Sequence, residues 1–389
     1  MRVNARVSSI AALLAATFVL GTVGCGEDLP PPQPPPPPPV SAPPPPPPPP
    51  EPPPPPPAPK KTLAELQAAS GQTMAEGFAA ADAKKVAALY TENAVMKMAG
   101  APDTTGRAAI EKSMTEFFAT FGKLKMGASR VVTKGDVVVT EWVMNATHSG
   151  EFMGIKATEK PVGWVGISVD WYTEDGAIKE SHVYWNPSVI GPQVGASKEK
   201  NRGVPALPAK ADVVAAGTKE DEEANVAAVE KLNRSLESKD EKAYGAFFTD
   251  DITWDDVTMP EASKGKPAVL KYFKALSTGF PDAKMATTHA WGHGNVVVEE
   301  GTYAGTNTGT LFGDKPTKKA VTIHEVTVYE LTKDHKVAKA VTYGNDLEMR
   351  MQLKPPAPAK AAAPAKPAAP AKPAAPAKPA APAKPAPKK

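Results

Sequence analysis

The sequence of 389 residues has a single cysteine, Cys25, few aromatic residues and no apolar run long enough to cross a bilayer. A lone cysteine has no partner for a disulfide within the chain. The longest apolar stretch near the N-terminus, residues 10–20, is shorter than the roughly 20 residues that a membrane-spanning helix needs. These absences exclude a disulfide-stabilised scaffold and give no sign of a transmembrane helix.

The N-terminus has the three-part layout of a secretory signal. Arg2 and Arg6 precede the apolar stretch, and small residues follow it up to Cys25. This layout resembles a bacterial lipoprotein signal, in which the cysteine becomes the lipidated first residue. Ordinary secretion with cleavage near Gly24 is the alternative. We expect a signal peptide over residues 1–24, lipidation of Cys25 and a place in the cell envelope, at the outer rather than the inner membrane because Gly26 follows the cysteine.

Two segments of biased composition flank the central part of the chain. Residues 25–61 are rich in proline and predict a stiff, extended linker, because proline cannot join helix or sheet hydrogen bonding. Residues 354–389 repeat alanine, lysine and proline and predict a disordered basic tail. The tail either binds cell-wall or lipopolysaccharide anions or has no partner. It carries no interleaved aromatic residues or arginines, so we expect no nucleic-acid binding.

The central part of the chain carries one module twice. Residues 106–186 match residues 265–345 at a constant offset of 159, which still holds at Gln193 and Gln352. The matched positions are mainly glycines and turn residues, with a tyrosine and an asparagine at the end: Gly106/Gly265, Gly135/Gly294, Gly150/Gly309, Tyr184/Tyr343 and Asn186/Asn345. Such spacing implies a repeated fold. We predict domains at residues 62–195 and 220–353, joined by a linker at 196–219.

Each copy has a helical part followed by strands. In the first copy, apolar periodicity predicts helices at residues 62–85, 85–90 and 108–121 and strands at 127–133, 137–147, 162–172 and 178–186. In the second copy it predicts helices at 222–239 and 267–276 and strands at 286–292, 295–306, 320–331 and 336–343. Helices followed by an antiparallel series of strands indicate the α+β class.

Several motifs of the first copy identify a family resemblance. They are Gly106-Arg107-Ala108-Ala109-Ile110, Gly135-Asp136-Val137-Val138-Val139, residues 147–154, Asp175-Gly176-Ala177-Ile178 and the closing Tyr184-Trp185-Asn186 with Gln193. Together they resemble SnoaL-like polyketide cyclases of the nuclear transport factor 2-like superfamily, and the second copy resembles them more faintly. The resemblance implies two cone-shaped domains, each with helices packed in a curved antiparallel sheet around a pocket. Sheets of this kind often pair as dimers, so we expect an intramolecular pseudo-dimer or a homodimer.

The same resemblance implies a catalytic position. In SnoaL-like cyclases an aspartate on the last strand is the general acid and base for aldol ring closure, seven residues before the position that Gln193 or Gln352 holds here. That position is Asn186 in the first copy and Asn345 in the second. An amide cannot transfer a proton near neutral pH. We therefore expect neither copy to use the family's usual catalytic group.

His182 is the other candidate for catalysis. Strand alternation puts His182, Tyr184 and Asn186 on one face, so all three line a pocket if Asn186 does. A histidine can act as a base near neutral pH, and a structural role is the alternative. The second copy has Val341 there, and its polar residues fit no familiar metal-binding spacing: Asp255, Asp256, His289, His293 and His324. We expect no metal and no cofactor, and a turn or solvated pair at Asp255-Asp256.

The candidate ligand-binding residues are Tyr184, Asn186, Trp164, Tyr343 and Asn345. Aromatic residues line apolar cavities, although core packing is the alternative for each of them. Three functions stay open. The first is a lipid-anchored extracytoplasmic protein that binds a small apolar molecule or a protein without catalysis. The second is a cyclase, isomerase or hydrolase acting through the first copy. The third is a scaffold between outer membrane and cell wall.

Overall fold

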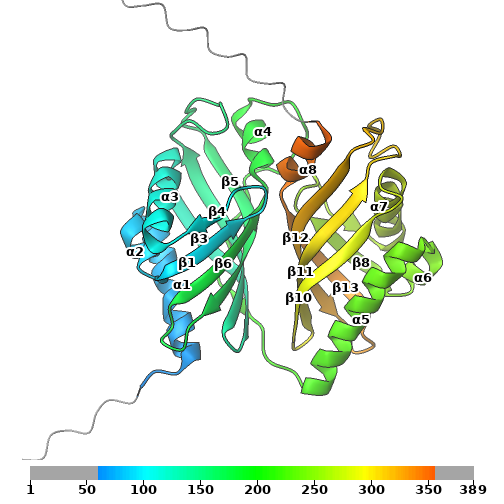
Figure 1. Ribbon diagram of the computed structural model, residues 1–389, viewed down its shortest axis with the longest axis horizontal. Coiled ribbons are helices and arrows are strands. Elements are labelled where there is room, and N and C mark those ends of the chain that lie inside the picture. Colours follow the sequence, from blue (N-terminus) through cyan, green and yellow to red (C-terminus); the bar gives the residue numbers. More distant parts are fainter. Residues whose placement is uncertain (1–59, 355–389) are drawn as a thin grey trace, which may run out of the picture. The chain divides into compact units, whose positions relative to one another are not determined.

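The computed structural model describes residues 60–354 (Figure 1). The predicted signal peptide, Cys25 and almost all of the proline-rich linker and of the basic tail lie outside the described residues. In residues 60–354, no helix combines the length and the apolar character needed to span a bilayer.

The first domain has helices on one face of a seven-stranded sheet (Figure 1). Its elements are α1 (Leu63–Ala80), α2 (Ala83–Ala87), β1 (Tyr90–Met98), β2 (Thr104–Thr105), α3 (Arg107–Thr120), β3 (Phe121–Lys134), β4 (Val137–His148), β5 (Pro161–Tyr172), β6 (Ile178–Trp185), a 3-10 turn η1 (Pro187–Val189) and α4 (Ile190–Val194). The strand order is β2-β1-β6-β5-β4-β3-β7, in which β7 (Asp212–Val213) comes from the linker between the domains.

The second domain repeats this arrangement with six strands in the order β10-β11-β12-β13-β8-β9. Its elements are α5 (Lys219–Ser238), α6 (Glu241–Gly245), β8 (Phe248–Asp256), β9 (Ser263–Lys264), α7 (Lys266–Gly279), β10 (Lys284–His293), β11 (Val296–Thr306), β12 (Ala320–Leu331), β13 (Val337–Gly344) and α8 (Asp346–Leu353). The fold therefore confirms two α+β domains, each with helices packed on a sheet.

The four predicted strands of each copy are present as antiparallel neighbours, but five strands escaped prediction: the two-residue strands β2, β7 and β9 and the longer β1 and β8. β1 and β8 pair in parallel with β6 and β13, so each sheet is mixed rather than wholly antiparallel. In both parallel pairings the register shifts after the first paired residue, and charged residues interrupt the apolar pattern of β1 and β8. The helix predicted at residues 62–85 ends at Ala80, because Ala81 adopts the left-handed conformation that terminates helices. α2 follows after the capping residue Asp82.

One repeated glycine pair reflects a close approach of two backbone segments. A side chain at Gly309 would collide with the carbonyl oxygen of Thr278 at the end of α7, and one at Gly150 would collide with Ala119 at the end of α3. Only glycine lets the chain after β4 or β11 pass this close to the helix. The matched glycines thus record a backbone constraint common to both domains.

The two sheets pack against each other through the faces opposite their helices. A single buried cluster contains residues from both sheets: Val132, Val137, Val139, Ile167, Val169 and Tyr184 from the first, and Val257, Val296, Val298, Val326, Val328, Val341 and Tyr343 from the second. Strand alternation produces this face, since every second residue of β4 and β5 points away from the helices. The two valine-rich faces exclude water from each other.

Buried polar contacts cross this interface in reciprocal pairs. The Tyr184 hydroxyl donates to Glu300 at 2.6 Å, and the Tyr343 hydroxyl donates to Glu141 at 2.7 Å. Both pairs obey the 159-residue offset, so each tyrosine of one domain meets the matched glutamate of the other. A buried carboxylate costs free energy unless it is hydrogen-bonded. The two tyrosines therefore stabilise the interface together with its apolar residues.

We expect Tyr343→Phe to lower the free energy of unfolding by about 1–3 kcal/mol, because it removes a hydrogen bond to the buried carboxylate of Glu141. Urea unfolding of the full chain measures this difference. Tyr303→Phe is the matched control, since the Tyr303 hydroxyl is buried without a hydrogen-bond partner in residues 60–354. That control should cost nothing. Equal losses in both variants would contradict the role given to Tyr343.

Candidate functional site

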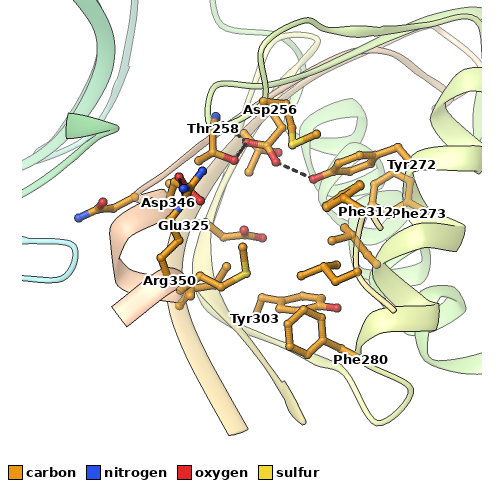
Figure 2. A pocket seen from close by; sticks show the side chains of 18 of the residues that line it. Asp256, Thr258, Tyr272, Phe273, Phe280, Tyr303, Phe312, Glu325, Asp346 and Arg350 are labelled. Carbon is orange, nitrogen blue, oxygen red and sulfur yellow. Dashed lines mark hydrogen bonds and ion pairs between the residues drawn. The ribbon is translucent and has the colours of Figure 1, made fainter. Parts of the chain in front are cut away.

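The second domain encloses a cavity of about 680 Å³ between its sheet and its helices (Figure 2). This volume lies within the range of roughly 300–1,000 Å³ that is typical of small-molecule sites. The walls come from α5, α6, α7, β8, β10, β11, β12 and β13, and α8 and residues 199–201 of the linker close one side. Exposed Lys315 and Lys354 belong to the lining, so the cavity reaches the surface beside α8.

Most of the wall is aromatic or aliphatic. The rings of Trp254, Phe273 and Tyr272 form a contiguous group. The ring centroid of Phe273 lies 4.7 Å from that of Trp254 and 5.1 Å from that of Tyr272. Phe312 stacks on Tyr272 at 5.9 Å, near the mouth. Tyr303 lines the opposite wall and lies beside Phe280, as Figure 2 shows. Such a wall favours a ligand with a substantial apolar part.

Glu325, on β12, points into this cavity (Figure 2). Burial raises the pKa of its carboxyl group to about 8, and the nearby carboxylates of Asp256, Glu299 and Glu348 add to the effect. No hydrogen bond from any residue in the described part of the chain offsets this rise. Glu325 is enclosed by the domain, yet its side chain is only half-buried because it faces the open space of the cavity.

Asp256, the second interior carboxylate, is held in place by hydrogen bonds. It accepts from the Tyr272 hydroxyl at 2.6 Å and from the Thr258 backbone N–H and hydroxyl at 2.8 and 2.7 Å. The sequence led us to expect Asp255 and Asp256 in a turn or in solvent. Instead, Asp256 ends β8 inside the cavity, and Asp255 forms an ion pair of 2.5 Å with Arg202 of the linker.

The charged groups of α8 neutralise one another at the edge of the cavity. Arg350 forms ion pairs with Asp346 at 2.5 Å and with Glu199 at 3.0 Å. Burial raises the pKa of Asp346, although Arg350 opposes that rise. Because the guanidinium is engaged twice, it does not compensate the carboxylate of Glu325.

The first domain fills the corresponding space with tryptophan. Trp142, Trp164 and Trp185 belong to one buried aromatic cluster, in which Trp164 lies 4.9 Å from Trp185 and 5.0 Å from Phe121. At the 159-residue offset these three tryptophans correspond to residues with small or aliphatic side chains: Gly301, Ile323 and Gly344. The position of Glu325 is Gly166 in the first domain, where any side chain would collide with the Trp142 ring. Trp164, a predicted ligand-binding residue, is part of this packed core.

The two asparagines at the expected catalytic position cap helices. Asn186 accepts from the Ser188 backbone N–H at 3.2 Å and begins η1, and Asn345 accepts from the Leu347 N–H at 3.0 Å and begins α8. Asn345 also donates to the Ala99 carbonyl of the first domain at 2.8 Å, which a carboxylate could not do. Asn345 lies at the edge of the cavity.

The repeated glutamines have a matched structural role. Gln193 exchanges two hydrogen bonds of 2.8 Å with the backbone of Gly163, and Gln352 exchanges bonds of 2.8 and 2.9 Å with Thr322. Each glutamine attaches the C-terminal helix of its domain to the first residues of β5 or β12.

His182 lies between the two sheets, and it does not line the cavity of the second domain. Its Nδ1 is 2.5 Å from Glu300, and its Nε2 is 2.8 Å from Glu180. Burial lowers the pKa of His182, but the two glutamates outweigh this effect and raise it overall. Both ring nitrogens face carboxylates, so neither offers a free lone pair to a substrate. Tyr184 and Tyr343 also lie in this interface, bonded to glutamates.

The remaining histidine candidates of the second copy have separate partners. His289 contacts Glu300 at 2.9 Å, His293 contacts the Val214 carbonyl at 3.1 Å, and His324 contacts Glu348 at 2.7 Å. They do not converge on a common point, and residues 60–354 contain no group of three or more His, Cys, Asp and Glu side chains arranged for a metal ion.

Sequence reasoning missed Glu325, although a signal for it was present. Matched positions of the repeat reveal the common fold, whereas the cavity depends on positions that differ. A tryptophan in one copy opposite a smaller residue in the other, glycine twice and isoleucine once, indicates one filled and one open interior. Glu325 opposite Gly166 marks the place where the open interior gains a charge.

The raised pKa of Glu325 predicts how stability depends on pH. The folded chain keeps this proton up to about pH 8, whereas the unfolded chain loses it near pH 4.5. The free energy of unfolding should therefore fall as pH rises between these values. The free energy of unfolding of Glu325→Gln, taken relative to that of the unmodified chain, should rise by on the order of 3 kcal/mol as the pH is raised from 5 to 8.5. Urea unfolding at both pH values measures this change.

Glu330→Gln is the matched control on the same strand. Burial opposes ionisation of Glu330, but Arg130 and Lys339 lower its pKa overall, so it stays ionised across this pH range. The stability difference between Glu330→Gln and the unmodified chain should stay constant from pH 5 to pH 8.5. A constant difference for Glu325→Gln as well would contradict the assignment of Glu325.

Comparison with known families gives one match to each domain. The family model described as SnoaL-like polyketide cyclase matches residues 69–194, and the model described as SnoaL-like domain matches residues 229–340. Together the two matches span more than half of the chain. A search of curated proteins gave no match.

Solved structures similar to this chain include three bacterial proteins, each covering about a third of it. A protein from Jannaschia sp. CCS1, described as a SnoaL-like polyketide cyclase, is 19% identical, with a TM-score of 0.34, and the match covers 36% of this chain and 99% of that one. AclR from Streptomyces galilaeus, described as a hydroxylase, is 21% identical (TM-score 0.32; 35% and 99% covered). IdmH from Streptomyces antibioticus, described as a polyketide cyclase, is 24% identical (TM-score 0.30; 33% and 98% covered). On the family matches, the chain belongs to the SnoaL-like family and carries two of its domains in tandem.

Proposed function

We propose that the chain binds a small apolar or amphipathic molecule in its second domain, and that the first domain is the structural partner of that binding domain. The observation that carries this proposal is the difference between the two interiors. The same fold encloses a cavity of about 680 Å³ in the second domain, whereas tryptophans fill the equivalent region of the first. An open apolar cavity costs stability. Ligand binding gives a reason for keeping it in one copy.

The proposal is binding without the usual cyclase chemistry. Asn345, where the family has its catalytic aspartate, caps α8 and donates to Ala99. The contacts of His182 support the same view, since Glu300 and Glu180 occupy both ring nitrogens. Turnover of a polyketide, steroid or epoxide substrate by the full chain, lost in His182→Ala, would overturn this part of the proposal.

We expect the full chain to bind N-phenyl-1-naphthylamine, a neutral apolar fluorophore, with an increase in its emission. The double variant Ile323→Trp/Gly344→Trp should lose this binding by about tenfold or more, because it introduces into the cavity the side chains that fill the first domain. Gly344 tolerates a side chain, since a Cβ there would meet only Thr258 Cγ2 at an ordinary distance of 3.7 Å.

Lys333→Trp/Asp334→Trp is the control for that experiment. It adds two tryptophans in an exposed turn that does not line the cavity. This variant should bind the fluorophore as the unmodified chain does. If both double variants bind equally well, the cavity of the second domain is not the binding site.

The proposal includes attachment to the cell envelope through a lipid on Cys25. The lone cysteine at the end of an apolar signal and the proline-rich segment after it support this arrangement. A ligand-binding domain on such a spacer would work at a fixed distance from a membrane. We expect Cys25→Ser to move the chain from the membrane fraction to the soluble fraction in a bacterial expression host.

Mass spectrometry of the mature N-terminus provides the second readout for the anchor. A lipid on Cys25 predicts the mass of a diacylated or triacylated cysteine on a chain that begins at that residue. An unmodified N-terminus produced by cleavage near Gly24 would instead indicate ordinary secretion.

A further inference from the structure

We propose that the cavity of the second domain selects an organic cation: a molecule with a protonated or quaternary ammonium group on an apolar body. This inference rests on the proposed function, because it assigns a ligand class to the same cavity. It derives from three features of the interior, namely an unpaired carboxyl group, the distribution of charges around it, and the aromatic wall that faces it.

The unpaired carboxyl group is that of Glu325. It projects from the middle of β12 into the cavity (Figure 2), and no residue in the described range 60–354 forms a hydrogen bond or an ion pair with it. Buried carboxylates in proteins are almost always paired. Two other acids of this domain follow that rule, since Asp256 is bonded to Tyr272 and Thr258, and Glu299 accepts from Tyr329 at 3.0 Å. Glu325 is therefore available to a ligand.

The charges around Glu325 make the interior negative. Asp256, Glu299 and Glu348 all disfavour a negative charge at Glu325. Of these, Glu348 is itself paired with His324 at 2.7 Å. The basic residues of the lining lie toward the surface, and the nearest to the interior, Arg350, is occupied by Asp346 and Glu199. A cation inside the cavity would relieve this repulsion. An anionic ligand would increase it.

The aromatic wall suits the same class of ligand. Tyr272, Phe273, Tyr303 and Phe312 contribute rings on several sides of the space that Glu325 enters, and Trp254 also lines it. Ring faces attract ammonium groups, including quaternary ones, and the attraction strengthens when water is excluded. These rings also accommodate the apolar body of the ligand. A carboxylate and aromatic rings together are the combination that recognises an alkylammonium ion.

A neutral ligand with a carbonyl oxygen is the main competitor, because protonated Glu325 could donate a hydrogen bond to it. The two classes predict opposite dependences on pH. Binding of a permanent cation should tighten as Glu325 ionises, whereas binding of a carbonyl acceptor should weaken. The pKa of about 8 places this transition in an accessible range.

The test uses two probes of one shape on the full chain. Benzyltrimethylammonium carries a permanent charge, and neopentylbenzene has a carbon in place of its nitrogen. Each probe is measured by displacement of N-phenyl-1-naphthylamine at pH 6 and pH 9. At pH 9 we expect the affinity for the cation to exceed that for the hydrocarbon by about tenfold or more. That preference should shrink by about tenfold or more at pH 6, whereas the affinity for the hydrocarbon should not change.

Glu325→Gln should abolish both the preference for the cation and its dependence on pH, and leave binding of the hydrocarbon intact. Glu330→Gln is the matched control, because it removes a carboxylate from the same strand at a residue that does not line the cavity. It should behave as the unmodified chain. A preference that survives in Glu325→Gln would overturn the assignment.

The outcomes separate this inference from the proposed function. If the fluorophore and the hydrocarbon bind and the cation gains no advantage at pH 9, the cavity binds apolar ligands and the inference is wrong. Cation binding that weakens as pH rises also contradicts it. If no probe binds and the fluorophore is not taken up, the proposed function itself fails. The two probes on the unmodified chain decide the question even if a variant does not fold.

Discussion

The packing of the two sheets against each other is the constraint on which the rest of the structure depends. Each sheet contributes a buried carboxylate, and a tyrosine of the other sheet satisfies it: Tyr184 for Glu300, and Tyr343 for Glu141. The valines around these pairs bury apolar surface, and the hydrogen bonds help to define the register, because a shift of either sheet would separate each carboxylate from the tyrosine that donates to it. One face of each sheet is thereby committed to the interface, and only the face toward the helices remains free to form a site.

That free face is where the two domains differ. The backbone is the same, yet Trp142, Trp164 and Trp185 fill one interior, and glycine or isoleucine at the matched positions leaves the other open. The filled domain gains the burial of large aromatic side chains. The open domain bears the cost of a cavity and of an unpaired acid, Glu325. Departures from good packing that are confined to one place are typical of functional sites.

Much of the fold followed from local pattern. The repeat, the antiparallel strands and the glycines were readable because they reflect backbone geometry and strand periodicity, as Gly150 and Gly309 show. β1 and β8 were not readable, since their pairing with β6 and β13 is parallel and nonlocal. For the candidate site, alternation correctly grouped His182 with Tyr184. It could not show whether that face pointed to a pocket or to the other domain, because period two relates residues to one another and not to their surroundings.

The sequence by itself determined the duplication, the α+β class of each copy, the family resemblance and the replacement of the usual catalytic aspartate by asparagine. Tertiary structure alone decided what the matched residues do. Tyr184 and Tyr343 join the sheets, Asn186 and Asn345 cap helices, and the cavity lies around a glutamate that only one copy possesses. The physical reason is that a side chain's role depends on what faces it. For these residues the facing group comes from a distant part of the chain.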